Sequence, residues 1–248
     1  MLILALESSA KPASVAVCAD GELLGLYFQN SGLTHSRTLL SMAESLLANL
    51  GVAAADIDMV AVSRGPGSFT GVRIGVSAAK GLAWGLGKPI CGVSTLEAMA
   101  RQSPESGAVL CPVMDARRGQ VYNALFEWRG GALARTREDR AISLECLAED
   151  LRALLAPAPN GQAPLGRAAS QAYLVGDGAE LARCYLESAG IPCRMAPELM
   201  RYQTAYGVAL AAMGADPVPA IELEPSYLRP SQAERERERR QGDGSSVF

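Results

Sequence analysis

The feature that most constrains the fold is an internal repeat in the order of the expected elements. In each half of the chain an apolar strand ends at a carboxylate, a hairpin signal follows, and a capping residue then precedes an amphipathic helix. The matched positions are Glu7 and Asp115, Asp20 and Gly130, and Thr34 and Ser143. These pairs are separated by 108, 110 and 109 residues. Three landmarks at nearly one offset predict two copies of a β-β-β-α-β unit, although the residues themselves are not similar.

Two such units facing each other across a cleft define the actin-like/sugar-kinase (ASKHA) fold, an α/β fold with two duplicated ribonuclease H-like halves. We expect the first half, which carries the partner-pairing helices, to cover residues 1–102. The second half is expected over residues 103–229, with residues 203–214 a candidate for packing back on the first half. Alternating Glu and Arg from Glu234 onward predict a mobile charged tail over residues 230–248.

The charge balance limits the classes of partner. The chain carries 23 Lys and Arg against 26 Asp and Glu, a net charge of −3, so a broad basic surface for gripping nucleic acid alone is not expected. Any RNA contact would be local or shared with a partner. No uncharged apolar run reaches the ~18 residues that a membrane span needs, and the amino terminus does not resemble a signal peptide. None of the six cysteines forms a C-x-x-C pair, so we expect reduced thiols in a cytoplasmic protein.

Two carboxylates stand where an actin-like cleft would hold a nucleotide. In that fold the turn after each first strand binds phosphates through backbone N–H groups, which favours glycine, and nearby carboxylates position Mg²⁺ or water. Here Glu7 and Asp115 supply the carboxylates. The first turn, residues 8–12, contains no glycine, and Pro12 removes a donor. The competing interpretation is that both carboxylates organise their own turns by accepting local N–H groups.

The second turn and a later glycine pair fit a nucleotide poorly as well. Arg117 and Arg118 precede the only glycine of the second turn, and their bulk leaves little room for a metal–nucleotide. Gly176, Asp177 and Gly178 complete a degenerate nucleotide cleft. We therefore expect no cofactor bound independently. A small actin-like ATPase or sugar kinase acting alone is the alternative.

A glycine-rich segment, Ser63–Gly75, joins a strand to a helix that Ser68 or Thr70 can cap. A helix start behind glycines can bind phosphate, so phosphate binding here is an open alternative, although the Lys-Ser/Thr pair of a P-loop is missing. Arg64 and Arg73 of this segment join Arg117 and Arg118 as candidates for contact with an anion or tRNA.

The helix after this segment carries two rows of small residues, Gly71, Gly75 and Ala79 on one face and Ser77, Gly81 and Gly85 on another. Each glycine inside a helix costs about 1 kcal/mol, so close packing must compensate. We expect the first-half helices to form a subunit interface, while internal packing of both rows is the alternative. The candidate interface residues are His35, Leu39, Ala43, Leu46, Gly71, Gly75 and Ala79. The free protein could homodimerise through the same helices.

The sequence lacks the groups of a self-sufficient hydrolase. His35 is the only histidine, whereas a catalytic zinc or iron site usually needs two or three. No G-x-S-x-G nucleophile motif is present. We therefore expect neither a metal site nor catalytic residues, and a metallopeptidase is the weakest alternative.

Several segments together resemble one family. They are Leu33–Arg37, Gly65–Gly75, Lys80–Ala83, Gly92–Ala98, Asp115–Tyr122 and Pro225–Arg229. They are similar to the bacterial TsaB (YeaZ) family of tRNA threonylcarbamoyladenosine biosynthesis proteins, and the resemblance runs from residue 2 to about residue 229. The stretches at 65–75 and 115–122 are the most specific.

The resemblance implies an inactive paralogue of TsaD, the subunit that transfers a threonylcarbamoyl group to N6 of adenosine 37 in ANN-decoding tRNAs. It implies pairing with a TsaD-like catalytic subunit through first-half helices, docking of a TsaE-like ATPase on the pair, tRNA contact through the complex, and a nucleotide only at the partner interface. TsaD holds a metal with two histidines, whereas this chain has only His35. The family usually has Asp where this chain has Glu7, so no role is carried over to that carboxylate.

Overall fold

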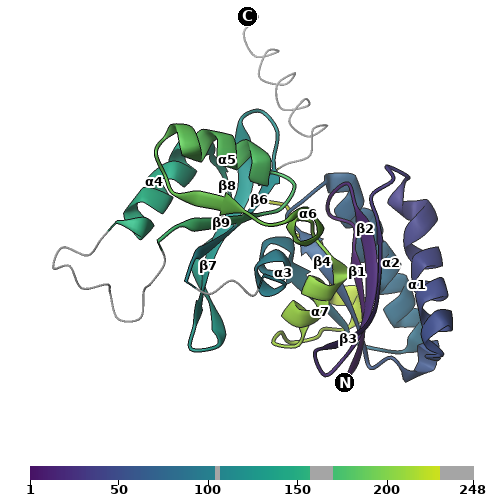
Figure 1. Cartoon of the computed structure of the whole chain (residues 1–248). Helices are drawn as coiled ribbons and strands as arrows, with labels where there is room; N and C mark the ends of the chain where they lie inside the picture. Colours follow the sequence, from purple (N-terminus) through teal and green to yellow (C-terminus); the bar gives the residue numbers. More distant parts are fainter. Residues whose placement is uncertain (104–106, 157–169, 230–248) are drawn as a thin grey trace, which may run out of the picture.

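The computed structural model describes residues 1–103, 107–156 and 170–229, which form two five-stranded sheets flanked by helices (Figure 1). The strand orders are β3-β2-β1-β4-β5 and β10-β9-β6-β7-β8. When the second order is read from its other edge, the two sheets have the same topology, with two antiparallel pairings followed by two parallel ones. The internal repeat and the ASKHA fold are therefore confirmed. The tail predicted over residues 230–248 lies outside the described residues.

The first half contains β1 (Leu2–Glu7), β2 (Ala13–Ala19), β3 (Glu22–Gln29), α1 (His35–Leu50), η1 (Ala54–Asp56), β4 (Met59–Gly65), α2 (Phe69–Leu86), β5 (Ile90–Ser94) and α3 (Thr95–Arg101). The second half contains β6 (Val109–Asp115), β7 (Gln120–Arg129), β8 (Ala132–Ser143), α4 (Leu144–Leu155), β9 (Ala172–Val175), α5 (Ala179–Ser188), β10 (Cys193–Met195) and α6 (Glu198–Arg201). Then follow α7 (Ala205–Ala212) and η2 (Ala220–Glu222).

The local signals explain most of these boundaries. The Asp20-Gly21 turn has positive φ angles of 48° and 88°, as its hairpin requires. Ser68 caps α2 by accepting the Gly71 N–H, and Ser143 caps α4 in the same way. Thr34 precedes α1 but its side chain makes no capping hydrogen bond. That cap was wrong.

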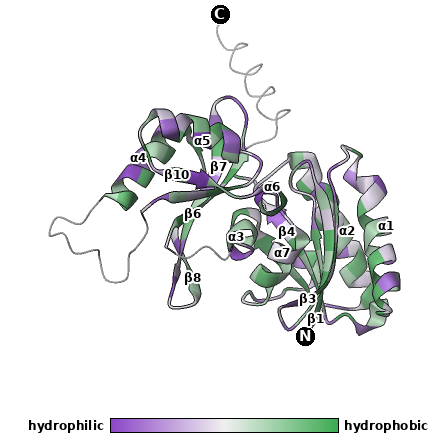
Figure 2. Ribbon diagram, in the orientation of Figure 1, coloured by the Kyte–Doolittle hydropathy of each residue, from purple (hydrophilic) through white to green (hydrophobic). Residues whose placement is uncertain are grey.

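Helices cover both faces of the first sheet, which is why β1 is apolar throughout. Leu4 and Leu6 pack in the layer under α1 and α2, whereas Ile3 and Ala5 face the opposite layer, which contains α7. The chain thus returns to the first half after the second sheet. The largely apolar α7 lies against the face opposite α1 and α2 (Figure 2).

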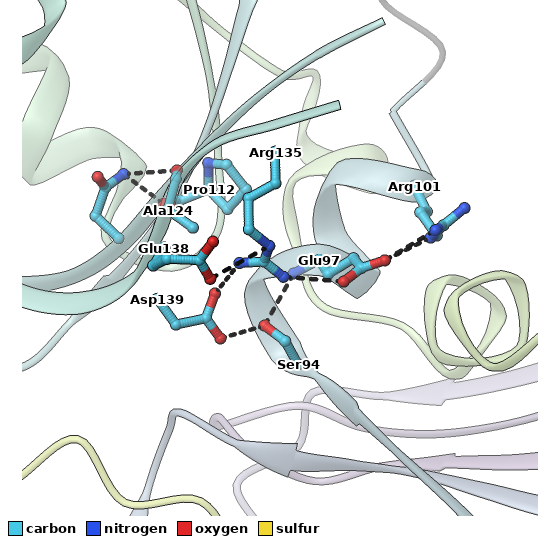
Figure 3. Close-up of polar contacts among 9 residues, drawn as sticks. Ser94, Glu97, Arg101, Pro112, Ala124, Arg135, Glu138 and Asp139 are labelled. Atoms are coloured by element: carbon cyan, nitrogen blue, oxygen red, sulfur yellow. Dashed lines mark hydrogen bonds and ion pairs between the residues drawn. The ribbon is translucent and has the colours of Figure 1, made fainter. Parts of the chain in front are cut away.

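Helix α3 and an ion-pair cluster join the two halves. Leu96 and Met99 of α3 are buried in a core shared with the second sheet. Beside them, Arg135 of β8 pairs with Glu97 of α3 at 2.9 Å and with Asp139, and the Ser94 hydroxyl donates to Asp139 (Figure 3). This cluster fixes one side of the boundary between the halves.

Candidate functional site

The first turn of the cleft is built around Glu7, at the end of β1. Its side chain is 1% exposed, and Oε1 accepts the Ser9 N–H at 2.6 Å. Oε2 has no hydrogen-bond partner among the described residues. Burial raises the pKa of this carboxyl above its ordinary value, which outweighs the hydrogen bonds from the turn. The carboxylate therefore organises its own turn, as the competing interpretation held.

The second turn repeats this device. Asp115 Oδ1 accepts the Arg117 N–H at 2.7 Å. Arg117 and Arg118 both have left-handed backbone conformations, with φ of 62° and 58°. Gly119 follows with a φ of 71°, and this left-handed conformation is one that Gly and Asn adopt far more readily than Arg. Both arginine side chains are exposed, so two bulky cations are held in an unfavourable turn at the edge of the cleft.

The start of α2 packs directly on the first turn. Ser68 N–H donates to the Ser9 carbonyl at 2.6 Å, and the Ser8 hydroxyl donates to the Gly71 carbonyl at 2.9 Å. A Cβ on Gly67 or Gly71 would collide with the Ser9 or Ser8 carbonyl oxygen. Because these carbonyl oxygens crowd the helix start, the open alternative of phosphate binding there is disfavoured.

The third cleft segment, residues 176–178, also packs closely against a neighbouring strand. Gly176 has a φ of 104°, and a Cβ there would collide with the Val113 carbonyl oxygen of β6. Gly178 N–H donates to that same carbonyl at 3.0 Å. Asp177, at the cleft edge, accepts from Gln203 at 3.2 Å, and loss of solvent around it raises its pKa. The glycines thus serve close packing of the chain on β6.

Residues 218–229, the C-terminal strap, run from the first half to the second. Val218 pairs with Ile90 at the edge of the first sheet through hydrogen bonds of 2.8 and 3.0 Å. Lys80 Nζ of α2 then donates to the carbonyls of Ile221 and Leu223, at 3.1 and 3.0 Å.

The strap continues over the start of α2. The Ser226 N–H donates to the Arg64 carbonyl at 2.6 Å, and the Tyr227 ring stacks on Phe69 with centroids 4.6 Å apart. Arg229 finally donates to the Ala116 carbonyl at 2.8 Å, inside the second turn. The strap therefore ties the end of β4 and the start of α2 to the second turn.

A cleft of about 850 Å³ lies between the two turns and the strap. It is lined by residues of both halves, including Lys11, Asp115, Arg117, Asp177 and Arg229. Of the predicted cleft residues, Glu7 lies beneath the first turn rather than in the lining. Arg64 and Arg118 are exposed, and neither belongs to this lining.

The structure places six of the candidate interface residues in the interior. They are Leu39, Ala43, Leu46, Gly71, Gly75 and Ala79. The leucine and alanine side chains belong to the core between the helices and the sheet, and the glycines lie against Ser8. The expected contact of these side chains with a partner is therefore corrected, because they face the protein's own sheet. His35 is partly exposed, and its Nε2 lies 2.8 Å from the Ala10 carbonyl oxygen.

The exposed side of α1 and α2 carries a different set of residues. A groove of about 490 Å³ runs between the helices and includes Leu40, Arg73 and Ser77. Leu40 is 49% exposed and Trp84 is 76% exposed. Gly81 and Gly85 have nothing within 4 Å of an added Cβ, so the second row of small residues faces outward.

Sequence reasoning missed the strap and the residues that hold it. Lys80, Gly92 and the segment Pro225–Arg229 were recognised as family signatures, but no role was assigned to them. In the structure Gly92 leaves space for Leu223 of the strap, just as Gly65 does for Ser226. None of these motifs has residues that a nucleotide cleft would use. That pattern could have indicated that they hold distant segments of the chain together.

Metal and membrane signals were searched within the parts of the chain that the structure describes. No three His, Cys, Asp or Glu side chains gather there in a metal-binding arrangement. In the same residues, no helix combines the length and apolar character that crossing a membrane would take.

The duplicated halves around a cleft define a member of the actin-like/sugar-kinase class. A family model described as "TsaD: tRNA N6-adenosine threonylcarbamoyltransferase" matches residues 29–193. The structure of YeaZ from Pseudomonas aeruginosa is similar with a TM-score of 0.70 at 28% identity, covering 92% of this chain and 99% of that one.

Two curated relatives carry the same description, "tRNA threonylcarbamoyladenosine biosynthesis protein TsaB". The one from Bacillus subtilis is 37% identical over 144 residues, which is 58% of this chain and 63% of the relative. The one from Escherichia coli is 40% identical over 129 residues, which is 51% and 55% respectively. The chain thus spans just over half the length of the curated relatives it matches. It belongs to the TsaB (YeaZ) family, which is related to TsaD.

Proposed function

We propose that this chain is a non-catalytic accessory subunit in the formation of N6-threonylcarbamoyladenosine at position 37 of ANN-decoding tRNAs, working in the cytoplasm. It pairs with a TsaD-like catalytic subunit, orders the active state of that subunit by differential binding, and together with it receives a TsaE-like ATPase and tRNA. A Mg²⁺–nucleotide cofactor is expected at the junction with the partner and not deep in the cleft of the lone chain.

One observation carries the accessory role. The polar groups that a nucleotide-binding cleft would direct at phosphates and Mg²⁺ are used inside the protein. Glu7 and Asp115 each accept an N–H of their own turn, and the start of α2 is packed against carbonyl oxygens. Glu7, moreover, is buried outside the cleft lining, so Asp115 is the only one of the two carboxylates placed to meet a bound Mg²⁺–phosphate among the described residues.

The exposed side of α1 and α2 is proposed as the pairing surface. Large apolar side chains that stay exposed beside a groove are typical of a protein interface. Here Leu33, Leu40 and Trp84 are 48%, 49% and 76% exposed, and the outward row of Ser77, Gly81 and Gly85 lets another helix approach closely. The proposed occupant is the corresponding helix pair of the TsaD-like subunit, as the family relationship suggests. A second copy of this chain is the competing occupant.

Size-exclusion chromatography with the TsaD-like subunit from the same cell tests this surface. Leu40→Arg places a charge in the groove and should abolish co-elution while the thermal melt of the lone chain stays unchanged. The matched control is Leu181→Arg, because Leu181 of α5 is similarly exposed, at 42%, but lies on the second half. Intact pairing of Leu40→Arg, or equal loss in both variants, would reject this surface.

The alternative is a small actin-like ATPase or sugar kinase acting alone, as the two-halved fold allows. It predicts saturable binding of Mg²⁺–ATP by the isolated chain and phosphate release. Isothermal titration with Mg²⁺–ATP separates the two functions, since an accessory subunit should show no heat of binding without its partner.

A further inference from the structure

Cationic side chains without carboxylate partners surround the mouth of the cleft. Lys11 and Arg117 line it, Arg118 follows in the same turn, and Arg73 lies in the adjoining groove. All four are exposed, and none forms an ion pair with a described residue. Arg135 and Arg183, by contrast, are each paired with carboxylates. Unpaired cations concentrated in one place, in a chain of net charge −3, point to an anionic ligand.

The conformation of the second turn supports a ligand role for its arginines. Two left-handed non-glycine residues in succession are unfavourable, and only Gly119, the third left-handed residue of the turn, is of the type that this conformation favours. Neither guanidinium bonds to another described residue, so the fold gains nothing from them. An unfavourable backbone conformation that no contact within the protein compensates is typical of a binding site.

Aromatic rings lie beside these cations. Tyr227 of the strap stacks on Phe69 at an interplanar angle of 28°, and the Arg73 guanidinium lies 5.2 Å from the Phe69 ring centroid on α2. Tyr227 is 41% exposed, and Tyr122 of β7 also lines the cleft. Aromatic rings interleaved with guanidinium groups are how proteins hold unpaired nucleotides, by stacking bases and pairing phosphates.

We infer that the mouth of the cleft binds a nucleotide unit, with its base on the side lined by Tyr122 and Tyr227 and its phosphate on Lys11 and Arg117. Arg118, the next residue of the same turn, adds positive charge beside this site. A free mononucleotide and an unpaired stretch of RNA share this chemistry. Asp115 and Asp177 line the same cleft and would repel several phosphates placed deep within it. A single phosphate at the mouth, as in an RNA strand lying across it, avoids that repulsion. The inference deepens the proposed function, because it assigns the tRNA contact of the complex to this site.

The test is direct binding of an unmodified tRNA transcript to the lone chain at low ionic strength, measured by fluorescence anisotropy. Arg117→Gln with Arg118→Gln should weaken binding about tenfold and lower the slope of log affinity against log salt by about 1 to 2. The control, Arg129→Gln with Arg152→Gln, removes two exposed arginines of the second half that lie on β7 and α4 and do not line the cleft; because Arg129 is paired with the buried Glu127, the thermal melt of this variant is measured alongside. It should leave both values unchanged.

A second variant separates binding from folding. Arg117→Asn with Arg118→Gly replaces both arginines by residues that tolerate a left-handed backbone, so it should raise the melting temperature while weakening tRNA binding as strongly as the glutamine pair. A structural role for the arginines predicts a lower melting temperature instead.

Competition with AMP identifies the source of the nucleotide. If AMP fails to displace tRNA, the site takes an RNA strand, and if AMP displaces it at micromolar concentration, the site takes a free nucleotide. The inference is overturned if wild-type chain binds neither probe, or if the arginine variants bind both as well as wild type does. Pairing with the TsaD-like subunit is measured separately, so failure here leaves that proposal standing.

Discussion

At the scale of single residues, the carboxylates at the ends of β1 and β6 hold the backbone of their own turns. Glu7 is the clearest case, because one carboxylate oxygen holds the Ser9 N–H and the other has no partner among the described residues. Its pKa is raised by burial, so the folded protein binds a proton there more tightly than the unfolded chain does.

This proton linkage fixes the sign of a pH dependence. The raised pKa of Glu7 means that its protonated form suits the folded state, so its contribution to stability is complete at acidic pH. That contribution is lost as pH rises from the ordinary glutamate range through the raised value. The loss is about 1.4 kcal/mol for each unit of pKa shift.

Glu7→Gln should therefore be more stable than wild type at mildly alkaline pH and closer to it at acidic pH, because the amide is neutral throughout and keeps an oxygen for the Ser9 N–H. Urea unfolding of both proteins at several pH values measures the difference. Glu7→Ala, which loses the Ser9 contact, is the control and should be less stable across the range. If the difference in unfolding free energy between wild type and Glu7→Gln did not change with pH, this account would be contradicted.

At the scale of elements, the two glycine rows of α2 differ in what they face. Gly75 lies against the Ser8 hydroxyl, and an added methyl would collide with it, whereas Gly81 has open space around it. Gly75→Ala should destabilise the lone chain despite the better helix propensity of alanine. Gly81→Ala should stabilise it by up to about 1 kcal/mol. Thermal melts of the two variants compare the two positions. Equal changes in melting temperature would mean that the row of Gly71, Gly75 and Ala79 is not closely packed.

The strap depends on one cation of α2. Lys80 Nζ donates to two strap carbonyls, and hydrogen bonds from a charged group contribute about 1.5–3 kcal/mol each. Lys80→Met keeps the aliphatic stem but removes both bonds, so it should loosen residues 218–229 locally. Hydrogen exchange of the Val218 and Ser226 amides should speed up while β1 amides stay protected. Unchanged exchange at Ser226 would show that the strap does not need this contact.

The sequence predicted the repeated elements because hairpin, cap and periodicity signals are local. Asp20-Gly21, Ser68 and Ser143 all mark the boundaries found in the structure. The direction in which a helix face points is set by tertiary packing. The row of Gly71, Gly75 and Ala79 therefore could not be assigned to the sheet or to a partner in advance. The strap escaped prediction for the same reason, since Arg229 meets Ala116 across 113 residues.

For the whole molecule, the halves are joined on two sides of their boundary. The strap links the start of α2 to the second turn through Tyr227 and Arg229, and the Arg135 cluster links α3 to β8 (Figure 3). A nucleotide-driven enzyme of this class needs its halves to open and close. Two fixed links suit a subunit that presents a constant surface to others.

The most direct test of this account is reconstitution of threonylcarbamoyl transfer to an unmodified tRNA transcript by the TsaD-like subunit and the TsaE-like ATPase, with and without this chain. The chain alone should give no modified adenosine, and its addition should raise the rate, whereas Leu40→Arg should not. Modification that proceeds equally well without the chain, or turnover of substrate by the chain on its own, would contradict the account.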